Sequence, residues 1–174
     1  MPDRPAHGLD AVNAMDRAAF VAAFGAVYED SPWVAEAAWE ARPFADAAAL
    51  RAALAGAVRT AGRERQRALI LAHPDLADRK ARAANLTAFS QTEQARAGLD
   101  ELTGAEAEEQ RALNRAYRAR FGFPFIMAVR HSTKQQILQA MRERVANEPE
   151  AEFARALQEI DRIAGYRLEE LVAG

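Results

Sequence analysis

Prolines fall at the boundaries of helical runs in this chain, and that arrangement constrains the fold more than any other feature. Apolar residues recur at three- and four-residue steps, as at Leu50, Leu54 and Val58, which is the spacing of one helix face. Pro32 and Pro43 follow or interrupt such runs, where a residue without an N–H group is tolerated. Period-two alternation, which would indicate half-buried strands, is not convincing anywhere. The pattern predicts an all-α fold, a single-domain bundle of about eight helices.

Capping residues predict where the later helices begin. Thr103 and Glu106 form a capping-box pair before a long helix. Ser132 or Thr133 is expected to start the next helix, because hydroxyl side chains can accept a hydrogen bond from a free N–H of the first turn. Asn147 is the expected cap of the last helix.

Length, composition and net charge indicate what kind of protein this chain can be. With 174 residues, 50% of them hydrophobic and 28% charged, the chain can bury a core of its own. We expect residues 1–12, which include two prolines and a glycine, to be a flexible N-terminal lead-in, and residues 13–174 to form a single helical domain. The net charge of −2 argues against nucleic acid or an anionic membrane surface as a partner.

The absence of cysteine removes further classes of protein. It excludes disulfides, thiolate nucleophiles and cysteine-ligated zinc or iron–sulfur sites. His7, His73 and His131 show no metal-ligand spacing, so no metal site is expected. No segment approaches the about 18 apolar residues of a membrane span, and the N-terminal stretch lacks the apolar core of a signal peptide. We therefore expect a cytoplasmic protein with no membrane partner.

His73, followed directly by Pro74, is the first candidate for chemistry. An imidazole can give and take a proton near neutral pH without special tuning. Pro74 disfavours helical dihedrals at His73, so the ring would lie at a helix junction. A histidine that caps the preceding helix through its last carbonyl groups is the structural alternative, and spacing alone favours that alternative.

The sequence SQTEQ, from Ser90 to Gln94, is the second candidate. Ser-x-x-Glu is a capping box, and this structural role alone would explain Ser90 and Glu93. Gln94 is less easily explained, and a helix N-terminus with free N–H groups suits an anionic ligand. Both interpretations remain open from the residues alone.

The sequence FGFPF, from Phe121 to Phe125, breaks the helical pattern. It can be a hydrophobic corner in which Gly122 takes an unusual dihedral and Pro124 ends the helix. It can also leave the backbone after Pro124 unpaired and available to a planar heterocycle. Residues 126–129 are too isolated for a sheet and are expected to be an extended connector. The aromatic side chains could stack bases, but core packing is the favoured interpretation.

Several segments taken in order carry a resemblance to one family. They are SPWVAEAAW, AHPDLA, SQTEQ, AGLD, LNRAYRARFGFPFI and a C-terminal Ile-Ala-x-x-Arg-Leu. The ordered set resembles the 2-oxo-4-hydroxy-4-carboxy-5-ureidoimidazoline (OHCU) decarboxylases over roughly Asp16 to Leu171. The resemblance implies an all-helical, cofactor-independent carboxy-lyase, usually a homodimer, that forms (S)-allantoin from OHCU in urate catabolism. It also shifts the interpretation of His73 from helix cap to catalytic residue.

The resemblance also implies which residues form the site. The catalytic histidine of the family corresponds to His73, in proton transfer, and its glutamate corresponds to Glu93. Its arginine corresponds to Arg167, with Arg162 as the alternative. Contacts with the small-molecule substrate are implied for a further set: Pro74, Ser90, Gln94, Phe125, Ile126, Met127, Ala128 and Val129.

One residue departs from the family pattern. After Ala-Val-Arg the family commonly has glycine, and here the residue is His131. If the position requires a positive φ, histidine adopts it only with strain. The other interpretation is a third proton carrier near the site.

Two other functions remain open from the sequence. One is a catalytically silent helical module that binds a ureide or a protein partner and has lost the reaction. The intact His73, Ser90, Glu93 and Gln94 argue against it. The other is a decarboxylase of a related ureide in another purine route.

Overall fold

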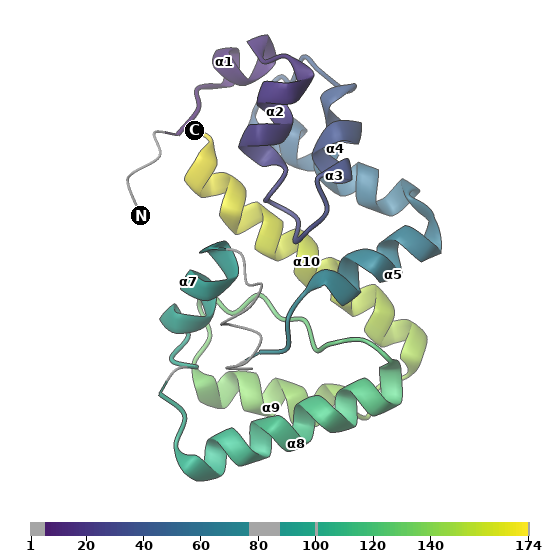
Figure 1. Cartoon of the computed structure of the whole chain (residues 1–174), viewed down its shortest axis with the longest axis vertical. Helices are drawn as coiled ribbons and strands as arrows, with labels where there is room; N and C mark the ends of the chain where they lie inside the picture. The colour runs from purple at the N-terminus through teal and green to yellow at the C-terminus, as the bar shows by residue number, and fades with distance from the viewer. Residues whose placement is uncertain (1–5, 77–87, 100, 174) are drawn as a thin grey trace. The chain divides into compact units, whose positions relative to one another are not determined.

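The computed structural model describes residues 6–76, 88–99 and 101–173, apart from the side chains of Ala88, Ser90, Gln91 and Arg96 (Figure 1). The described residues form nine α-helices and no sheet, so the all-α prediction is confirmed. They are α1 (Leu9–Ala14), α2 (Arg17–Phe24), α3 (Trp33–Trp39), α4 (Ala47–Thr60), α5 (Gly62–Ala72), α7 (Ala88–Arg96), α8 (Gly104–Phe121), α9 (Lys134–Arg144) and α10 (Pro149–Leu171). None of these helices is long and apolar enough to cross a membrane.

The chain divides into two compact units. One contains Met1–Ala72 with Asp161–Gly174, and the other contains His73–Ile160. We refer to them as the terminal unit and the central unit, and we describe each by itself. That residues 13–174 form one domain stays a prediction.

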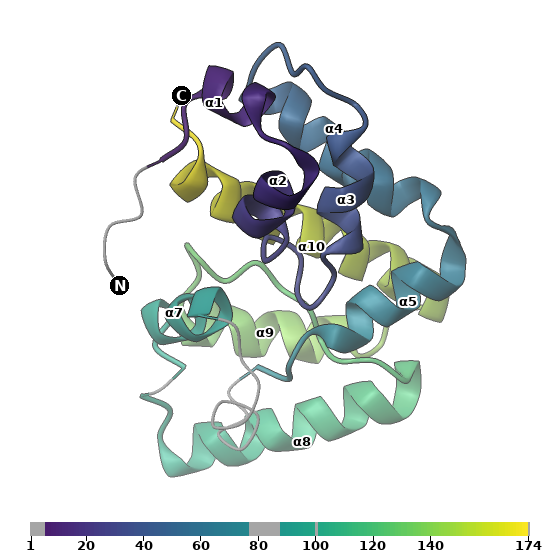
Figure 2. The same ribbon diagram turned by 45° about the horizontal axis from the view of Figure 1, so that its top comes forward.

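The terminal unit is built on consecutive contacts along the chain. Helix α2 packs on α3, α3 on α4, and α4 on α5 (Figure 2). Asp16 and Asp46 cap α2 and α4, since each carboxylate accepts a hydrogen bond from a backbone N–H three residues later, at 2.8 and 2.7 Å. Phe20 and Leu50 are fully buried on the inner faces of these helices.

The N-terminal stretch contains structure that the sequence analysis did not predict. The backbone N–H of His7 donates to the Leu171 carbonyl at 2.7 Å, and the His7 carbonyl accepts from the Ala173 N–H at 3.0 Å. Helix α1 begins at Leu9, inside the range expected to be a flexible lead-in. The described part of that range is therefore joined to the C-terminal end of α10.

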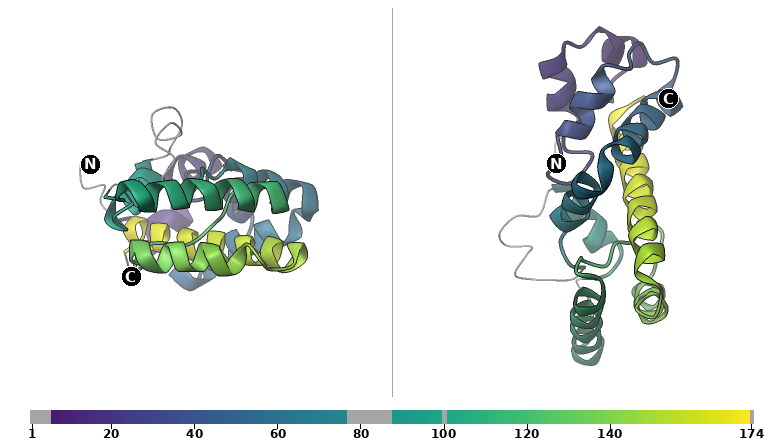
Figure 3. Two further views of the ribbon diagram at one scale, coloured as in Figure 1. Left: turned by 90° about the horizontal axis from the view of Figure 1, so that it is seen from below. Right: turned by 90° about the vertical axis from the view of Figure 1, so that its right-hand side faces the viewer.

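In the central unit, α8 and α9 lie side by side and run in the same direction (Figure 3). At their N-terminal ends, Lys134 Nζ donates to Glu106 Oε2 at 2.7 Å. At their C-terminal ends, Arg120 Nη2 donates to the Asn147 carbonyl at 3.0 Å. The connector between two such parallel helices has to return along their length. Residues 122–133 make that return, and the predicted connector, residues 126–129, contains neither helix nor strand.

Of four helix-capping residues predicted from the sequence in the central unit, two are confirmed and two are wrong. Thr103 and Thr133 each form a capping box at the start of α8 and α9. Helix α7 begins at Ala88, so Ser90 is not at the N-cap position that a capping box requires. The Asn147 side chain donates to the Glu152 carboxylate at 2.8 Å, and α10 begins at Pro149.

From the sequence, residues 74–84 can be helical with Pro74 at the first position. Most of that range lies outside the described residues, and residues 74–76 are not helical.

Candidate functional site

His73 lies directly after the last residue of α5, at the junction that the sequence predicted. The following proline takes the chain out of the helix, because its ring is incompatible with helical geometry at the preceding residue. The side chain of His73 is buried, with 6% of its surface exposed. It therefore lies in a protected environment in which a single proton donor or acceptor can be positioned.

Helix α8 anchors the two residues that follow the His-Pro pair. Arg118 Nε donates to both carboxylate oxygens of Asp75 at 2.9 Å. The Leu76 carbonyl accepts from Gln110 Nε2 and Asn114 Nδ2, both at 3.0 Å. Gln110, Asn114 and Arg118 are spaced by four residues and share one face of α8. The geometry of the His-Pro segment is therefore set by one ridge of a neighbouring helix.

Glu93 and Gln94 lie on the last turns of α7. Gln94 is buried, with 4% exposed, and Glu93 is half-buried. The helix ends where Gly98 takes a φ of 70° and the Leu99 N–H donates to the Gln94 carbonyl at 3.3 Å. This is the bond pattern of a Schellman cap, which only a residue that tolerates positive φ completes without strain. The cap holds the turn that carries Gln94, whose burial gives a polar amide to the interior of the central unit.

In the segment 125–129 the side chains of Phe125, Ile126 and Val129 are buried, and those of Met127 and Ala128 are half-buried. Gly122, with a φ of 71°, ends α8, and the side chains of Phe125 and Ile126 are 1% and 3% exposed. Tyr117, Phe121, Phe123 and Phe125 pack together with ring centroids 4.5–6.0 Å apart, so the aromatic side chains belong to the core as favoured.

Side chains bond two backbone polar groups in this segment. Arg144 Nη1 donates to the Ile126 carbonyl at 2.8 Å, and the Ala128 N–H donates to Glu159 Oε2 at 2.9 Å. The N–H and C=O groups of Met127, by contrast, form no hydrogen bond to the described part of the chain. Met127 is half-buried, so these two groups are a candidate for ligand binding.

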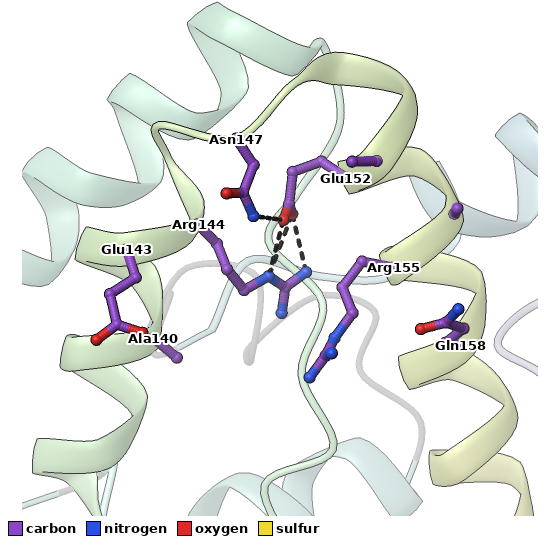
Figure 4. Close-up of a pocket in the computed structure, with 9 residues that line it drawn as sticks. Ala140, Glu143, Arg144, Asn147, Glu152, Arg155 and Gln158 are labelled. Carbon is purple, nitrogen blue, oxygen red and sulfur yellow. Dashed lines mark hydrogen bonds and ion pairs between the residues drawn. The ribbon is translucent and has the colours of Figure 1, made fainter.

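A buried network of charged residues contacts the segment 125–129 through Arg144. Arg144 donates to the Glu152 carboxylate, with Nη2 2.9 Å from Oε2, and the Tyr117 hydroxyl donates to the same carboxylate. Figure 4 shows Arg144, Asn147 and Glu152 converging at the end of α9, beside a hollow of about 420 Å³ that Arg155 and Gln158 also line.

Burial and hydrogen bonding in this network shift the pKa values of Glu152 and Tyr117. Burial alone would raise the pKa of the Glu152 carboxyl, but hydrogen bonds from Arg144, Tyr117 and Asn147 outweigh it and lower that pKa. Burial, together with the bond to Glu152, raises the pKa of the Tyr117 hydroxyl. Glu152 is therefore ionised and Tyr117 neutral at neutral pH, which keeps the Arg144 guanidinium paired.

The two candidate arginines differ in environment. Arg167 is 2% exposed, and its Nη1 donates to Glu29 Oε2 and to the Val27 carbonyl, both at 3.1 Å. Arg162 is exposed. A buried guanidinium bonded to a buried carboxylate has little room to change its direction.

The structure brings most of the predicted site residues into one unit. His73, Pro74, Glu93, Gln94 and 125–129 belong to the central unit, and Arg167 belongs to the terminal unit. The side chain of Ser90 lies outside the described residues. His131 is exposed and is not strained, since Asp30 is the only non-glycine residue with positive φ among those described.

Sequence reasoning missed the residues that bond the segments after His73 and around Met127. Gln110, Arg118, Arg144 and Glu159 were not singled out, because ordinary charged and amide residues on amphipathic helices carry no local signal. Spacing could have marked Gln110, Asn114 and Arg118 as one helix face. Among the described residues, no group of three or more histidine and carboxylate side chains is arranged to hold a metal ion.

Comparison with known families gives one consistent match. The family model for OHCU decarboxylase matches residues 13–169. The 2-oxo-4-hydroxy-4-carboxy-5-ureidoimidazoline decarboxylase of Halalkalicoccus jeotgali is 45% identical over 163 residues, which cover 94% of this chain and 90% of that protein. The decarboxylase of Mus musculus is 37% identical over 92% of this chain and 90% of its own length.

Two solved structures are similar to this chain, and both come from proteins that form or were crystallised with (S)-allantoin. A crystal structure of (S)-allantoin synthase superposes with a TM-score of 0.78 and 32% identity, covering 95% of this chain. This chain spans 54% of the synthase chain. An OHCU decarboxylase crystallised in the presence of (S)-allantoin superposes with a TM-score of 0.63 over 80% of this chain and 89% of that one. At 21% identity, the second likeness is one of fold alone.

Proposed function

We infer that this chain, which belongs to the OHCU decarboxylase family, converts OHCU to (S)-allantoin in urate degradation. The family consists of carboxy-lyases, which break a carbon–carbon bond and release CO₂. One observation supports the inference most directly: His73 is buried in the same compact unit as Gln94 and the unpaired backbone of Met127.

The chemistry requires little beyond orientation and a proton. Loss of CO₂ leaves an electron pair on the ring carbon, and the neighbouring C=N group can accept it. The carbon that lost CO₂ keeps its oxygen and becomes the ring carbonyl, while the adjacent carbon of the former C=N group, which bears the ureido group, takes up a proton. We propose that His73 delivers this proton to one face of the ureido-bearing carbon, which sets the configuration of the product. Glu93 and Gln94 are proposed to bond the N–H and carbonyl groups of the substrate. Pro74, Ser90 and the backbone of residues 125–129 complete the proposed contacts.

Arg167 is the proposed anion-binding arginine. Its burial and its bond to Glu29 support this choice over Arg162, because a site residue has to present its charge in one direction. An exposed side chain such as Arg162 loses rotamer freedom on binding and is screened by water.

The test is a circular-dichroism time course on freshly prepared OHCU. Wild-type protein should accelerate formation of the S enantiomer, and His73→Ala should lose about 10²- to 10⁴-fold in rate and give racemic product from the uncatalysed background. His131→Ala is the matched control, since that histidine is exposed, and it should retain the wild-type rate. Equal enantiomeric excess from wild type and His73→Ala would refute the role of His73.

Two coarser expectations are proposals as well. We propose a homodimer, as the family resemblance implies, so light scattering should give twice the 19.1 kDa of one chain. We also propose the cytoplasm as its compartment, to be checked by fractionation of cells that express the tagged protein.

A further inference from the structure

Two backbone groups beside Met127 are bonded by side chains rather than by another part of the backbone. Arg144 donates to the Ile126 carbonyl, and Glu159 accepts from the Ala128 N–H, at 2.8 and 2.9 Å. The two side chains come from α9 and α10, so both helices fix the positions of these two backbone groups.

The two bonds also orient the backbone groups of Met127, which lies between the bonded residues. Each peptide unit is planar and trans, so a bond to the Ile126 carbonyl also sets the direction of the Met127 N–H. The bond to the Ala128 N–H sets the Met127 carbonyl in the same way. Met127 therefore presents a donor and an acceptor, each pointing away from the bonded group of its own peptide unit.

Both bonding side chains are themselves held in place. Arg144 is 8% exposed, lies 4.4 Å from the centroid of the Phe125 ring, and is paired with Glu152, which is fully buried. Glu159 is 2% exposed, and its second oxygen lies 2.8 Å from Arg155 Nη2. A guanidinium and a carboxylate fixed in this way lose little freedom in making their backbone bonds.

We propose that Arg144 and Glu159 are positioning residues that hold the segment 126–128 so that Met127 recognises one amide unit of the substrate. An amide or ureide N–H with its adjacent C=O is the complementary pair, and OHCU and allantoin both contain it. The inference rests on the proposed function for the identity of the ligand. It adds which residues act on the segment and which backbone groups bind.

The proposal is tested by substituting Glu159 rather than Arg144. Removing Arg144 would leave Glu152 buried without its cation and would destabilise the fold. Glu159→Gln keeps an oxygen that accepts from the Ala128 N–H, whereas Glu159→Met keeps the length of the side chain without an acceptor. Both variants remove the charge, so an effect that depends only on the ion pair with Arg155 would appear in both. Glu109→Gln, at an exposed ion pair with Arg142 in the same unit, is the control.

Steady-state kinetics should separate the two variants. Glu159→Met should raise KM about tenfold, the value of one net hydrogen bond, with a smaller change in kcat. Glu159→Gln and Glu109→Gln should stay within about threefold of wild type, less than the loss of one such bond. Equal kcat/KM for the Met and Gln variants would overturn the proposal.

Amide measurements on ¹⁵N-labelled protein test the same proposal without turnover. The Ala128 N–H should be protected from hydrogen exchange in wild type and Glu159→Gln and lose protection in Glu159→Met. Titration with (S)-allantoin should shift the Met127 amide resonance. Equal exchange in all three proteins, or an unmoved Met127 resonance, would overturn the inference. If wild-type protein does not accelerate allantoin formation, the proposed function is refuted. The exchange measurement would still test whether Glu159 accepts a hydrogen bond from the Ala128 N–H.

Discussion

Replacing Tyr117 by phenylalanine should destabilise the central unit through one lost hydrogen bond. The Tyr117 hydroxyl is buried and donates to the Glu152 carboxylate, which also accepts from Arg144 and Asn147. Tyr117→Phe leaves the ring and its contacts with Phe121 and Phe125 in place. The change therefore isolates a bond between a neutral hydroxyl and an ionised, buried carboxylate.

The magnitude follows from the charge on the acceptor. A hydrogen bond to a charged group contributes about 1.5–3 kcal/mol, roughly twice a neutral one. For a chain of this length, each kcal/mol corresponds to about 2–4 °C in Tm, so Tyr117→Phe should lower Tm by about 3–12 °C at pH 7.

The effect of Tyr117→Phe should depend on pH. The pKa of Glu152 is lowered in the folded state, so its stabilising bonds are fully present above its ordinary pKa of 4.5 and are lost as pH falls through the folded value. The difference between wild type and variant should therefore shrink when the protein is acidified below about pH 4.5. Differential scanning calorimetry across this range measures it.

Tyr28→Phe is the matched control. The Tyr28 hydroxyl is also buried, but it has no hydrogen-bond partner in the described part of the chain. Removing it should leave Tm unchanged or raise it, because an unsatisfied buried hydroxyl costs about 1–3 kcal/mol. If both variants lower Tm equally at pH 7, the energy assigned to the Tyr117–Glu152 bond is wrong.

Three other substitutions test separate features. Arg167→Met removes a buried cation bonded to the buried Glu29 carboxylate and should cost about 3–5 kcal/mol, measured by urea unfolding; a loss below 1 kcal/mol would contradict a buried pair. Gly122→Ala forces an L residue to a φ of 71° and should cost about 1–2 kcal/mol in the same assay. Arg118→Ala removes a half-exposed ion pair that anchors the His-Pro segment, so kcat should fall by up to about tenfold with under 1 kcal/mol lost in stability, whereas Arg115→Ala should change neither.

Local physics explains where prediction from the sequence succeeded. The capping boxes at Thr103 and Thr133 depend on residues three apart, and the left-handed glycine at Gly122 depends on one residue and its neighbours. The prediction at Asn147 was wrong because its amide bonds the Glu152 carboxylate, which tertiary packing buries nearby.

The sequence by itself determined the helical class, the helix ends that depend on local caps and prolines, the junction at His73, and the family. Only the tertiary structure decided that Glu159 bonds the Ala128 N–H, that Arg144 bonds the Ile126 carbonyl, and that α8 anchors the segment after His73. Contacts within one helical turn can be read from spacing because the backbone fixes their distance. Contacts between residues 18 to 43 positions apart depend on which helix faces meet, and that is set by the packing of the whole core.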